Sequence, residues 1–568
     1  MDRREERGLI KFVLKAVQEP SLICIICGMS SALFAQSAFA FDIETDNPDL
    51  KLRWDNTVRY STAWRVKGQS PLLINSPPAT TNQDDGDRSF NKGLISNRLD
   101  LFSEFDASFR NFGARVSGAA WYDDIYNSTN DNNSPSTVNA VSVPFNHFTK
   151  TARDLHGRKA EILDAFIYGK GELGEMAGTF RLGRHALLWG ESLFFGNNGI
   201  AGTQSSVDII KLSSVPNSLF KETIRPDDQV SGQLQITSDL AIGAYYKFSW
   251  EKNRLPVAGS YFASTDIING GERLIAGAPI IPTGGPRAFF RADDQEAKNS
   301  GQGGFEVKWR PPATDLDLGF YAVRFHDRSP VIYQYPGVGV NPATGQIGLY
   351  KLVYPENINA YGASASTTFG SVNVAGEVSL RRHATLVSDA QAVPPNAPAD
   401  NNSNPLYAIG NTAHAQVSFL WAVDPNFIAR ESSLAAEVAW NRTLSVTKNP
   451  GAVDPNTQRD AFGLRLVYSP TYRQIMSGID ITVPVGFSYF PKGKSSAVAN
   501  FGVDKGGDFT LGVAGSYLDV WRFSLSYTQF YGKEGTFLAL GPTGIPRFSF
   551  AQAFKDRNFV ALSFSRTF

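Results

Sequence analysis

The sequence predicts an all-β protein, a transmembrane antiparallel β-barrel of about 18 strands (roughly 16–20) with long extracellular loops and short periplasmic turns. Apolar and polar side chains alternate over many segments of about ten residues, a length that lets a tilted strand cross a bilayer. Beyond the N-terminus, no run of about 18 uncharged apolar residues predicts a membrane-spanning helix. Aromatic residues make up 12% of the chain, with 51 glycines and 4 methionines, which favours strands and turns over helices.

Residues 1–40 are predicted to be a signal peptide. Basic residues between positions 3 and 15 precede a short apolar core at 21–35, and Ala38-Phe39-Ala40 supplies the small residues of a cleavage site before Phe41. Both cysteines fall inside this segment, so no disulfide or thiolate metal site is expected in the mature chain. The formal net charge of +0 gives no indication of nucleic-acid binding, and no nucleic-acid partner is expected.

The mature chain, residues 41–568, is expected to form a single barrel whose first strand runs from about 50 to 66. One face of this strand is apolar: Leu50, Leu52, Trp54, Val58, Tyr60, Trp64 and Val66. The opposite face carries Arg53, Asp55 and Arg59. A water-filled barrel interior hydrates such charges easily, whereas the core of a soluble sheet does not.

The remaining strands are separated alternately by short turns and long loops. They are predicted near 96–108, 112–122, 158–169, 178–188, 228–236, 240–250, 301–310, 315–326, 358–369, 371–381, 411–421, 434–445, 460–469, 479–490, 509–518, 521–531 and 557–568. An even count places both chain ends on the periplasmic side, where short turns belong. Arg324 breaks the alternation of its strand, and a β-bulge near Gly319 would restore it.

Tryptophans are expected at both membrane interfaces, where amphipathic rings are favoured. Those near the predicted periplasmic ends of strands are Trp54, Trp309, Trp421 and Trp521. Those near the predicted outer ends are Trp64, Trp121, Trp189 and Trp250.

The last predicted strand has one apolar face, formed by Val560, Leu562, Phe564 and Phe568, and one small polar face. It resembles the terminal strand of bacterial outer-membrane barrels, although Arg566 stands where such strands more often carry an apolar residue. This resemblance implies that the barrel-assembly machinery reads the strand ending in Phe568. Outer-membrane lipid and lipopolysaccharide are the other partners expected of such a barrel.

Two stretches resemble a known family. They are the run from Asp46 to Tyr60, and Arg-Leu-Gly-Arg at 181–184 followed by Trp189-Gly190-Glu191. Both are similar to signatures of the proteobacterial outer-membrane proteins grouped as domain-of-unknown-function family 1302, and the likeness covers the mature chain. The resemblance implies location in the outer membrane of a Gram-negative bacterium, but it implies no mechanism.

The connection at 190–226 is too apolar for a solvated loop. Its candidate ligand or gate residues are Phe194, Phe195, Ile209, Ile210, Leu212 and Phe220. Two hypotheses remain open: the segment folds inward and lines an apolar pocket or gate, or it forms a lid packed on its own residues outside the membrane. Arg181, Arg184 and His185 precede the segment and are candidates to orient an acid or hydroxyl group of a ligand.

Charges of both signs are predicted on the lumen face of the first two strands: Arg53, Asp55, Arg59, Arg98, Asp100 and Glu104. They would either select a charged permeant or pair with one another in a structural network. The mixture of signs favours the paired network.

No catalytic or cofactor motif is found, and the chain is not expected to be an enzyme or to hold a cofactor. The six histidines stand apart from any G-x-S-x-G or H-E-x-x-H pattern. Asp84, Asp85 and Asp87 lack the spacing of an EF-hand, so a solvated loop or divalent bridging to lipopolysaccharide is favoured over a metal site.

The favoured function is uptake of a hydrophobic or amphipathic small molecule (aromatic, terpenoid, steroid or fatty-acid-like) through the barrel. The alternative is a non-transporting structural or assembly barrel that partners an inner-membrane transporter. A barrel-embedded lipid hydrolase is the third hypothesis.

Overall fold

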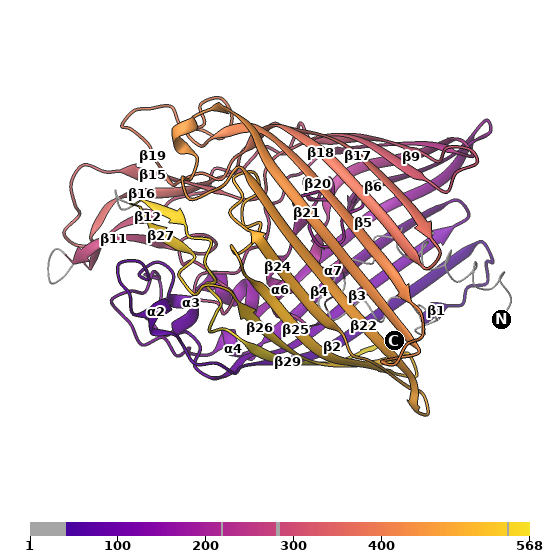
Figure 1. Cartoon of the computed structure of the whole chain (residues 1–568), viewed down its shortest axis with the longest axis horizontal. Coiled ribbons are helices and arrows are strands. Elements are labelled where there is room, and N and C mark those ends of the chain that lie inside the picture. The colour runs from indigo at the N-terminus through magenta and orange to yellow at the C-terminus, as the bar shows by residue number, and fades with distance from the viewer. Residues whose placement is uncertain (1–40, 217, 219, 280–284, 542–544) are drawn as a thin grey trace.

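The computed structural model describes residues 41–216, 218, 220–279, 285–541 and 545–568, so the predicted signal peptide and Ile280 to Pro282 lie outside the described residues. The main sheet closes on itself as an antiparallel barrel (Figure 1). This sheet has 20 strands. One of them, β1 (Phe41–Ile43), pairs only with β2 and is not part of the ring, and β23 and β24 together form one interrupted strand. The barrel therefore has 18 strands. The predicted fold class is confirmed.

The barrel strands match the predicted segments one for one. They are β2 (Leu50–Arg65), β3 (Gly93–Phe109), β4 (Phe112–Asp123), β5 (Arg158–Leu173), β6 (Met176–His185), β9 (Asp227–Thr237), β10 (Leu240–Lys247), β13 (Gly303–Trp309), β14 (Asp317–Phe325), β17 (Ile358–Phe369), β18 (Val372–Thr385), β20 (Ile409–Val423), β21 (Glu431–Lys448), β22 (Asp460–Met476), β23 (Ile479–Thr482) with β24 (Val485–Lys492), β25 (Gly507–Tyr517), β26 (Trp521–Tyr531) and β29 (Phe559–Thr567). The last strand, β29, pairs with both β26 and β2, which closes the ring. Strand β1, the first described element, and the C-terminus both lie at the short-turn end of the barrel (Figure 1).

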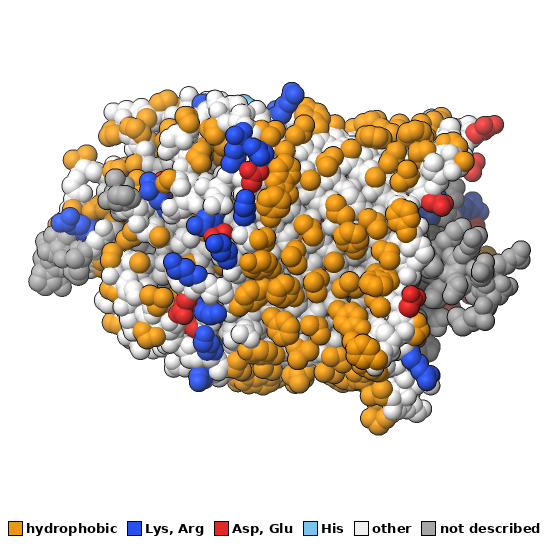
Figure 2. Space-filling model, viewed as in Figure 1, with side chains coloured by type: hydrophobic (Ala, Val, Ile, Leu, Met, Phe, Trp, Pro, Cys, Tyr) orange, Lys and Arg blue, Asp and Glu red, His pale blue; other side chains and the backbone are white. Residues whose placement is uncertain are grey.

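The predicted alternation sorts the side chains of each strand between bilayer and lumen. Tyr60 and Phe564 are 45% and 46% exposed, whereas Arg59 and Ser563 are 3% and 1% exposed. Figure 2 shows the outward apolar side chains as a band across the visible face of the barrel, with Lys and Arg gathered along its loop-side border. Such a band suits the hydrocarbon layer of a membrane.

None of the helices in the described part of the chain is long and apolar enough to span a membrane.

The predicted bulge near Gly319 is wrong. The strand β14 pairs with β13 and β17 without any shift in register, and Arg324 points outward at its loop-side end, where its Nη2 donates to Asn357 Oδ1 at 2.7 Å. A charge is tolerated there because the strand has already left the hydrocarbon layer. Gly319 instead leaves room for the inward ring of Tyr321, since a Cβ at this position would lie 2.1 Å from the Tyr321 hydroxyl.

The predicted outer belt of tryptophans is also wrong for three of its four members. Trp121, Trp189 and Trp250 are 5–7% exposed and pack inside the molecule. Trp121 faces the interior, where the cations of Arg98 and Lys211 lie over its ring, 4.9 and 4.6 Å from the centroid. The turn-side tryptophans Trp54, Trp309 and Trp421 are exposed.

The loop-side end holds more structure than the predicted loops allowed. Short helices and turns are α2 (Pro71–Ile74), α3 (Asp85–Arg88), α4 (Asp124–Asn127), α5 (Lys150–Ala152), η2 (Arg153–Gly157), η3 (Ala201–Thr203), α6 (Ile209–Ser214), α7 (Phe220–Thr223) and η4 (Pro450–Ala452). Additional strands are β7 (Ser206–Val207), β8 (Ile224–Arg225), β11 (Arg273–Pro279), β12 (Pro286–Arg291), β15 (Val331–Pro336), β16 (Gln346–Val353), β19 (Gln391–Ala392), β27 (Leu538–Leu540) and β28 (Pro546–Phe548). Five of them, β11, β12, β16, β15 and β19, form a separate sheet beyond the barrel mouth.

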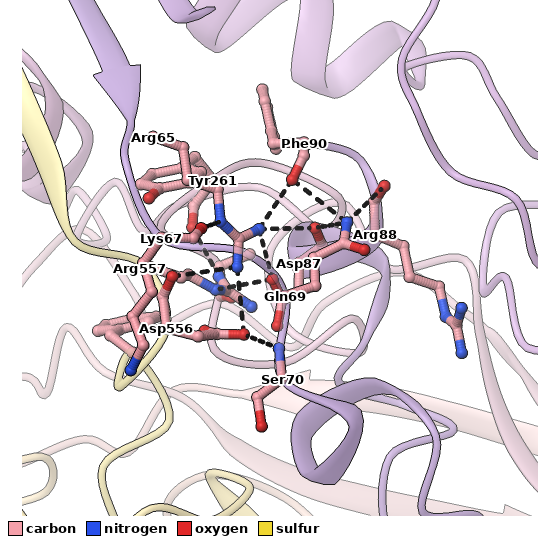
Figure 3. A network of polar contacts seen from close by, with 12 residues as sticks. Arg65, Lys67, Gln69, Ser70, Asp87, Arg88, Phe90, Tyr261, Asp556 and Arg557 are labelled. Atoms are coloured by element: carbon pink, nitrogen blue, oxygen red, sulfur yellow. Dashed lines mark hydrogen bonds and ion pairs between the residues drawn. The ribbon is translucent and has the colours of Figure 1, made fainter. Parts of the chain in front are cut away.

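An ion-pair clasp, formed by Arg65, Asp87, Asp556 and Arg557, joins the first long loop to the closing strands of the barrel (Figure 3). The guanidinium of Arg65 contacts Asp87 at 2.6 Å and Asp556 at 3.1 Å, and all three side chains are at most 1% exposed. Arg557 donates to the carbonyls of Tyr261 and Ala263 at 2.6 and 2.7 Å. The clasp therefore holds three separate parts of the loop-side end together.

Candidate functional site

The inward arm, residues 190–226, connects β6 to β9 and contacts inward-facing side chains on opposite sides of the barrel. Its first part lies against β18, β20 and β21, and its second part lies against β2 and β3. Because these two groups of strands are far apart around the ring, the arm crosses the lumen. Its helices α6 and α7 lie within the barrel outline in Figure 1.

Two buried carboxylates on the wall hold the first part of the arm. Glu377 of β18 accepts hydrogen bonds from the backbone N–H of Glu191 at 3.0 Å and of Ile200 at 2.6 Å. Glu437 of β21 accepts from the N–H groups of three successive residues, Leu193 to Phe195, at 2.5–3.3 Å. A charged acceptor strengthens each of these bonds, so the chain turns at the wall where the two carboxylates lie.

Asn198 and Arg381 complete the attachment at this wall. Asn198 Nδ2 donates to the carbonyls of Ala415 and Trp440 at 3.3 and 3.2 Å, and its Oδ1 accepts from Asn441 Nδ2 at 3.2 Å. Arg381 Nη2 donates to the carbonyls of Asn197 and Gly199 at 2.8 and 2.9 Å. Backbone polar groups that would be unsatisfied in a buried loop are thereby paired.

Ion pairs hold the second part of the arm. Glu222 contacts Arg59 at 2.6 Å in a buried pair, and Lys221 contacts Glu104 at 3.0 Å in a partly exposed pair. The lumen charges singled out from the sequence are brought together here: Arg98 pairs with Asp100 at 2.8 Å, and Arg53 pairs with Asp55 at 2.8 Å. All six predicted lumen charges thus take part in ion pairs, some with one another and some with the arm.

The predicted apolar ligand residues separate into different surroundings. Phe195 packs against Phe490 and Phe501, with ring centroids 6.0 and 5.7 Å apart, and Phe194 lies under the Arg465 guanidinium at 5.9 Å. Ile210 instead joins a buried cluster that contains Phe90, Tyr126 and Tyr261. Ile209 is partly buried and Leu212 is exposed. Phe220 begins α7, and its side chain lies outside the described residues.

The basic candidates before the arm lie on the wall of β6. His185 is buried, with Nε2 2.8 Å from Ser231 Oγ and Nδ1 3.0 Å from the carbonyl of Gly183. The guanidinium of Arg181 lies over the Phe166 ring at 5.7 Å, and Arg184 is partly buried. None of the three lines the cavity described next.

A cavity of about 150 Å³ lies between the arm, the wall and the loops at the loop-side end. Its apolar lining includes Phe325, Ile332, Ile358, Leu386, Val387, Val498, Leu538 and Phe548, and its polar lining includes Asn197, Asp327, Arg328 and Arg381. The Nε atoms of Arg328 and Arg381 are buried and have no hydrogen-bond partner among the described residues. Burial raises the pKa of Asp327 above its ordinary value.

This combination of an apolar wall with two guanidinium groups suits a ligand that is largely apolar and carries an acidic or hydroxyl group. Sequence reasoning missed Arg328 and Asp327. Both residues lie in a loop just after β14. The sequence of a loop has no periodicity from which an inward-facing side chain could be predicted.

Solved structures that are similar to this chain include three bacterial proteins. Acinetobacter baumannii OccAB3 has 10% identity and a TM-score of 0.43, covering 91% of this chain and 99% of that chain. A. baumannii OccAB1 has 11% identity and a TM-score of 0.42, covering 94% and 99%. Pseudomonas aeruginosa OccK1 has 10% identity and a TM-score of 0.37, covering 91% and 98%. No curated protein matches the sequence.

The sequence profile of the family described as "Protein of unknown function (DUF1302)" matches residues 21–568. This match includes both stretches that resemble the family and all 18 strands of the barrel. The chain belongs to the DUF1302 family.

Proposed function

We propose that this outer-membrane barrel is a passive channel for a hydrophobic or amphipathic small molecule, such as an aromatic, terpenoid, steroid or fatty-acid-like compound. The observation that supports the proposal most is the cavity of about 150 Å³ between the inward arm and the wall, with its apolar lining and its two arginines. Paired charges elsewhere in the lumen leave less basis for selecting a small ion.

Arg381 connects ligand binding to the position of the arm. Its guanidinium lines the cavity and also donates to the carbonyls of Asn197 and Gly199. A carboxylate entering the cavity competes with these carbonyls for the same donors and forms a stronger bond, because the interaction is between opposite charges. The ligand would thereby loosen the constriction through which it must pass.

Single-channel recordings of the refolded mature chain in planar bilayers test the channel role. The intact chain is expected to conduct small ions weakly, and deletion of residues 193–220 is expected to open a large pore. If intact and deleted chains conduct alike, the arm is not the constriction. If neither conducts, a non-transporting barrel that partners another protein is the better interpretation.

Flux into liposomes tests the substrate class. Decanoate is expected to enter faster than decanol. Arg381→Ala is expected to reduce this preference by about tenfold, which corresponds to the free energy of one or two charge-assisted hydrogen bonds. Arg382→Ala is the matched control, because Arg382 is the next residue of the same strand and is exposed. An unchanged preference in Arg381→Ala would contradict the assigned role. Release of fatty acid from bilayer lipid, lost in Ser231→Ala, would instead indicate a hydrolase.

A further inference from the structure

Three aspartates from two distant loops meet at the loop-side end of the molecule. Asp84 and Asp85 lie in the first long loop, and Asp266 lies in the connection between β10 and β13. Carboxylate oxygens of the three residues lie within 4.8 Å of one another. Asp84 and Asp266 are 0% exposed and Asp85 is 5% exposed, so bulk water does not screen their charges.

Cations supplied by the protein do not balance these carboxylates. Arg88 contacts Asp84 at 2.6 Å, but neither Asp85 nor Asp266 forms an ion pair among the described residues. The neighbouring arginines Arg65 and Arg557 are engaged in the clasp with Asp87 and with backbone carbonyls (Figure 3). A buried charge without a partner destabilises the folded state strongly, so a further positive charge is expected here.

The hydrogen bonds of the cluster leave specific oxygens open. Asp84 Oδ2 accepts from Arg88 and Thr137, and Asp266 Oδ2 accepts from the N–H of Asp85 at 3.1 Å. In contrast, Asp84 Oδ1 and Asp266 Oδ1 are buried and have no hydrogen-bond partner among the described residues. A buried carboxylate oxygen in this state calls for a further partner, because native proteins seldom leave such atoms unpaired.

We propose that Asp84, Asp85 and Asp266 bind a calcium ion. Calcium takes six to eight oxygen ligands at about 2.3–2.6 Å, so oxygens on opposite sides of one ion are about 5 Å apart, which matches the spread of the cluster. The absence of nitrogen and sulfur ligands in the cluster disfavours zinc and copper. Ligands drawn from two separate loops suit the irregular geometry that calcium accepts better than the near-ideal octahedron that magnesium demands.

The consequence of calcium binding would be to join loops that the backbone does not join. Asp85 also accepts from Asn132 Nδ2 at 3.1 Å and from the N–H of Asn139 at 2.8 Å, both in the loop between β4 and β5. Gly86 lies so close to the β10–β13 connection that a Cβ would be 2.5 Å from the Ser260 carbonyl. One ion would therefore fix three loops over the barrel mouth, next to the ion-pair clasp.

Calcium titration of the full mature chain in detergent, after removal of divalent ions with a chelator, tests this proposal. Isothermal calorimetry is expected to show one calcium ion per chain and weaker binding of magnesium, and calcium is expected to raise the melting temperature. Asp266→Asn is expected to weaken calcium binding by more than about tenfold, since it removes one of three charged ligands. Asp293→Asn, an exposed aspartate of the same connection, is the control and is expected to bind as the wild type does.

The calcium-free melting temperature distinguishes loss of a site from loss of the fold. Asp266→Asn removes a buried charge, so in chelator this variant is expected to melt at a higher temperature than the wild type while no longer responding to calcium. Absence of saturable binding to the wild type, or equal binding by Asp266→Asn, would overturn the proposal. A melting temperature that depends on pH but not on calcium would also overturn it, because protons would then neutralise the cluster.

Discussion

The inward arm lies inside the barrel and the ion-pair clasp lies at its loop-side end, and different interactions hold them. Buried carboxylates hold the first part of the arm through its backbone N–H groups, as in the bonds from Phe194 and Phe195 to Glu437, whereas the buried Arg59–Glu222 pair holds its second part. Buried arginines and aspartates hold the clasp through charge pairs. Breaking a hydrogen bond that water can replace costs about 1 kcal/mol, whereas stranding a buried charge costs about 3–5 kcal/mol. The clasp is therefore the fixed joint, and the first part of the arm is the part that can move.

The largest expected effect comes from removing the central cation of the clasp. Arg65→Ala leaves Asp87 and Asp556 buried without their shared partner, and we expect it to lower the free energy of unfolding by about 3–5 kcal/mol. Thermal unfolding followed by circular dichroism in detergent measures this effect. Arg53→Ala is the control, because the Arg53 side chain is 56% exposed and its pair with Asp55 is worth little. Equal melting of the two variants would mean that the clasp is not a fixed joint.

A second prediction concerns the pH dependence of the clasp. Burial, with repulsion from Asp87, raises the pKa of Asp556 to about 6 from an ordinary 3.8. The folded state therefore holds this proton more tightly than the unfolded state, and the wild type loses stability as the pH rises from about 4 to 6. Asp556→Asn lacks this loss, so its stability relative to the wild type should rise by about 3 kcal/mol between pH 4 and pH 7. Melting temperatures that fall in parallel would contradict the prediction.

The arm is expected to respond in conductance more than in stability. Glu437→Gln keeps an acceptor oxygen but removes the charge that three N–H groups share, so we expect a loss of only about 1–2 kcal/mol in unfolding free energy. Because the arm is held less firmly, the open time of single channels should increase. Glu431→Gln, at the exposed turn-side end of the same strand, is the control. Unchanged gating in Glu437→Gln would place the movable part elsewhere.

The sequence predicted the wall of the barrel well because each strand is specified locally. Alternation alone decides which side chains face lipid, and β14 keeps that alternation to its last residue. The prediction of a bulge failed because Arg324 was treated as a lipid-facing residue, although it lies at the rim beside Asn357. Trp121 shows the same limit, since its position near a strand end does not reveal that Arg98 and Lys211 lie over its ring inside the barrel.

The interior sites could not be predicted to the same extent because they depend on contacts between distant residues. The apolar composition of residues 190–226 singled out the arm. It did not predict that Glu377 and Glu437 accept hydrogen bonds from the backbone of the arm. Asp84 and Asp85 stand next to each other in the sequence, whereas Asp266 reaches them only through the folded loops. A single sequence contains no signal for contacts between residues of different loops, because loops lack the regular periodicity of strands and helices.

The smallest expected effect concerns the far end of the arm. The pair between Lys221 and Glu104 is partly exposed, with side chains 40% and 12% accessible, so Lys221→Gln should change the unfolding free energy by less than about 1 kcal/mol. The Lys221→Gln variant is most informative when it is combined with Glu437→Gln, which acts at the opposite wall of the barrel. Separate contacts this far apart should have additive effects on open time. If the arm moves as one body, either variant frees the whole arm, and the double variant will open little more than the stronger single variant.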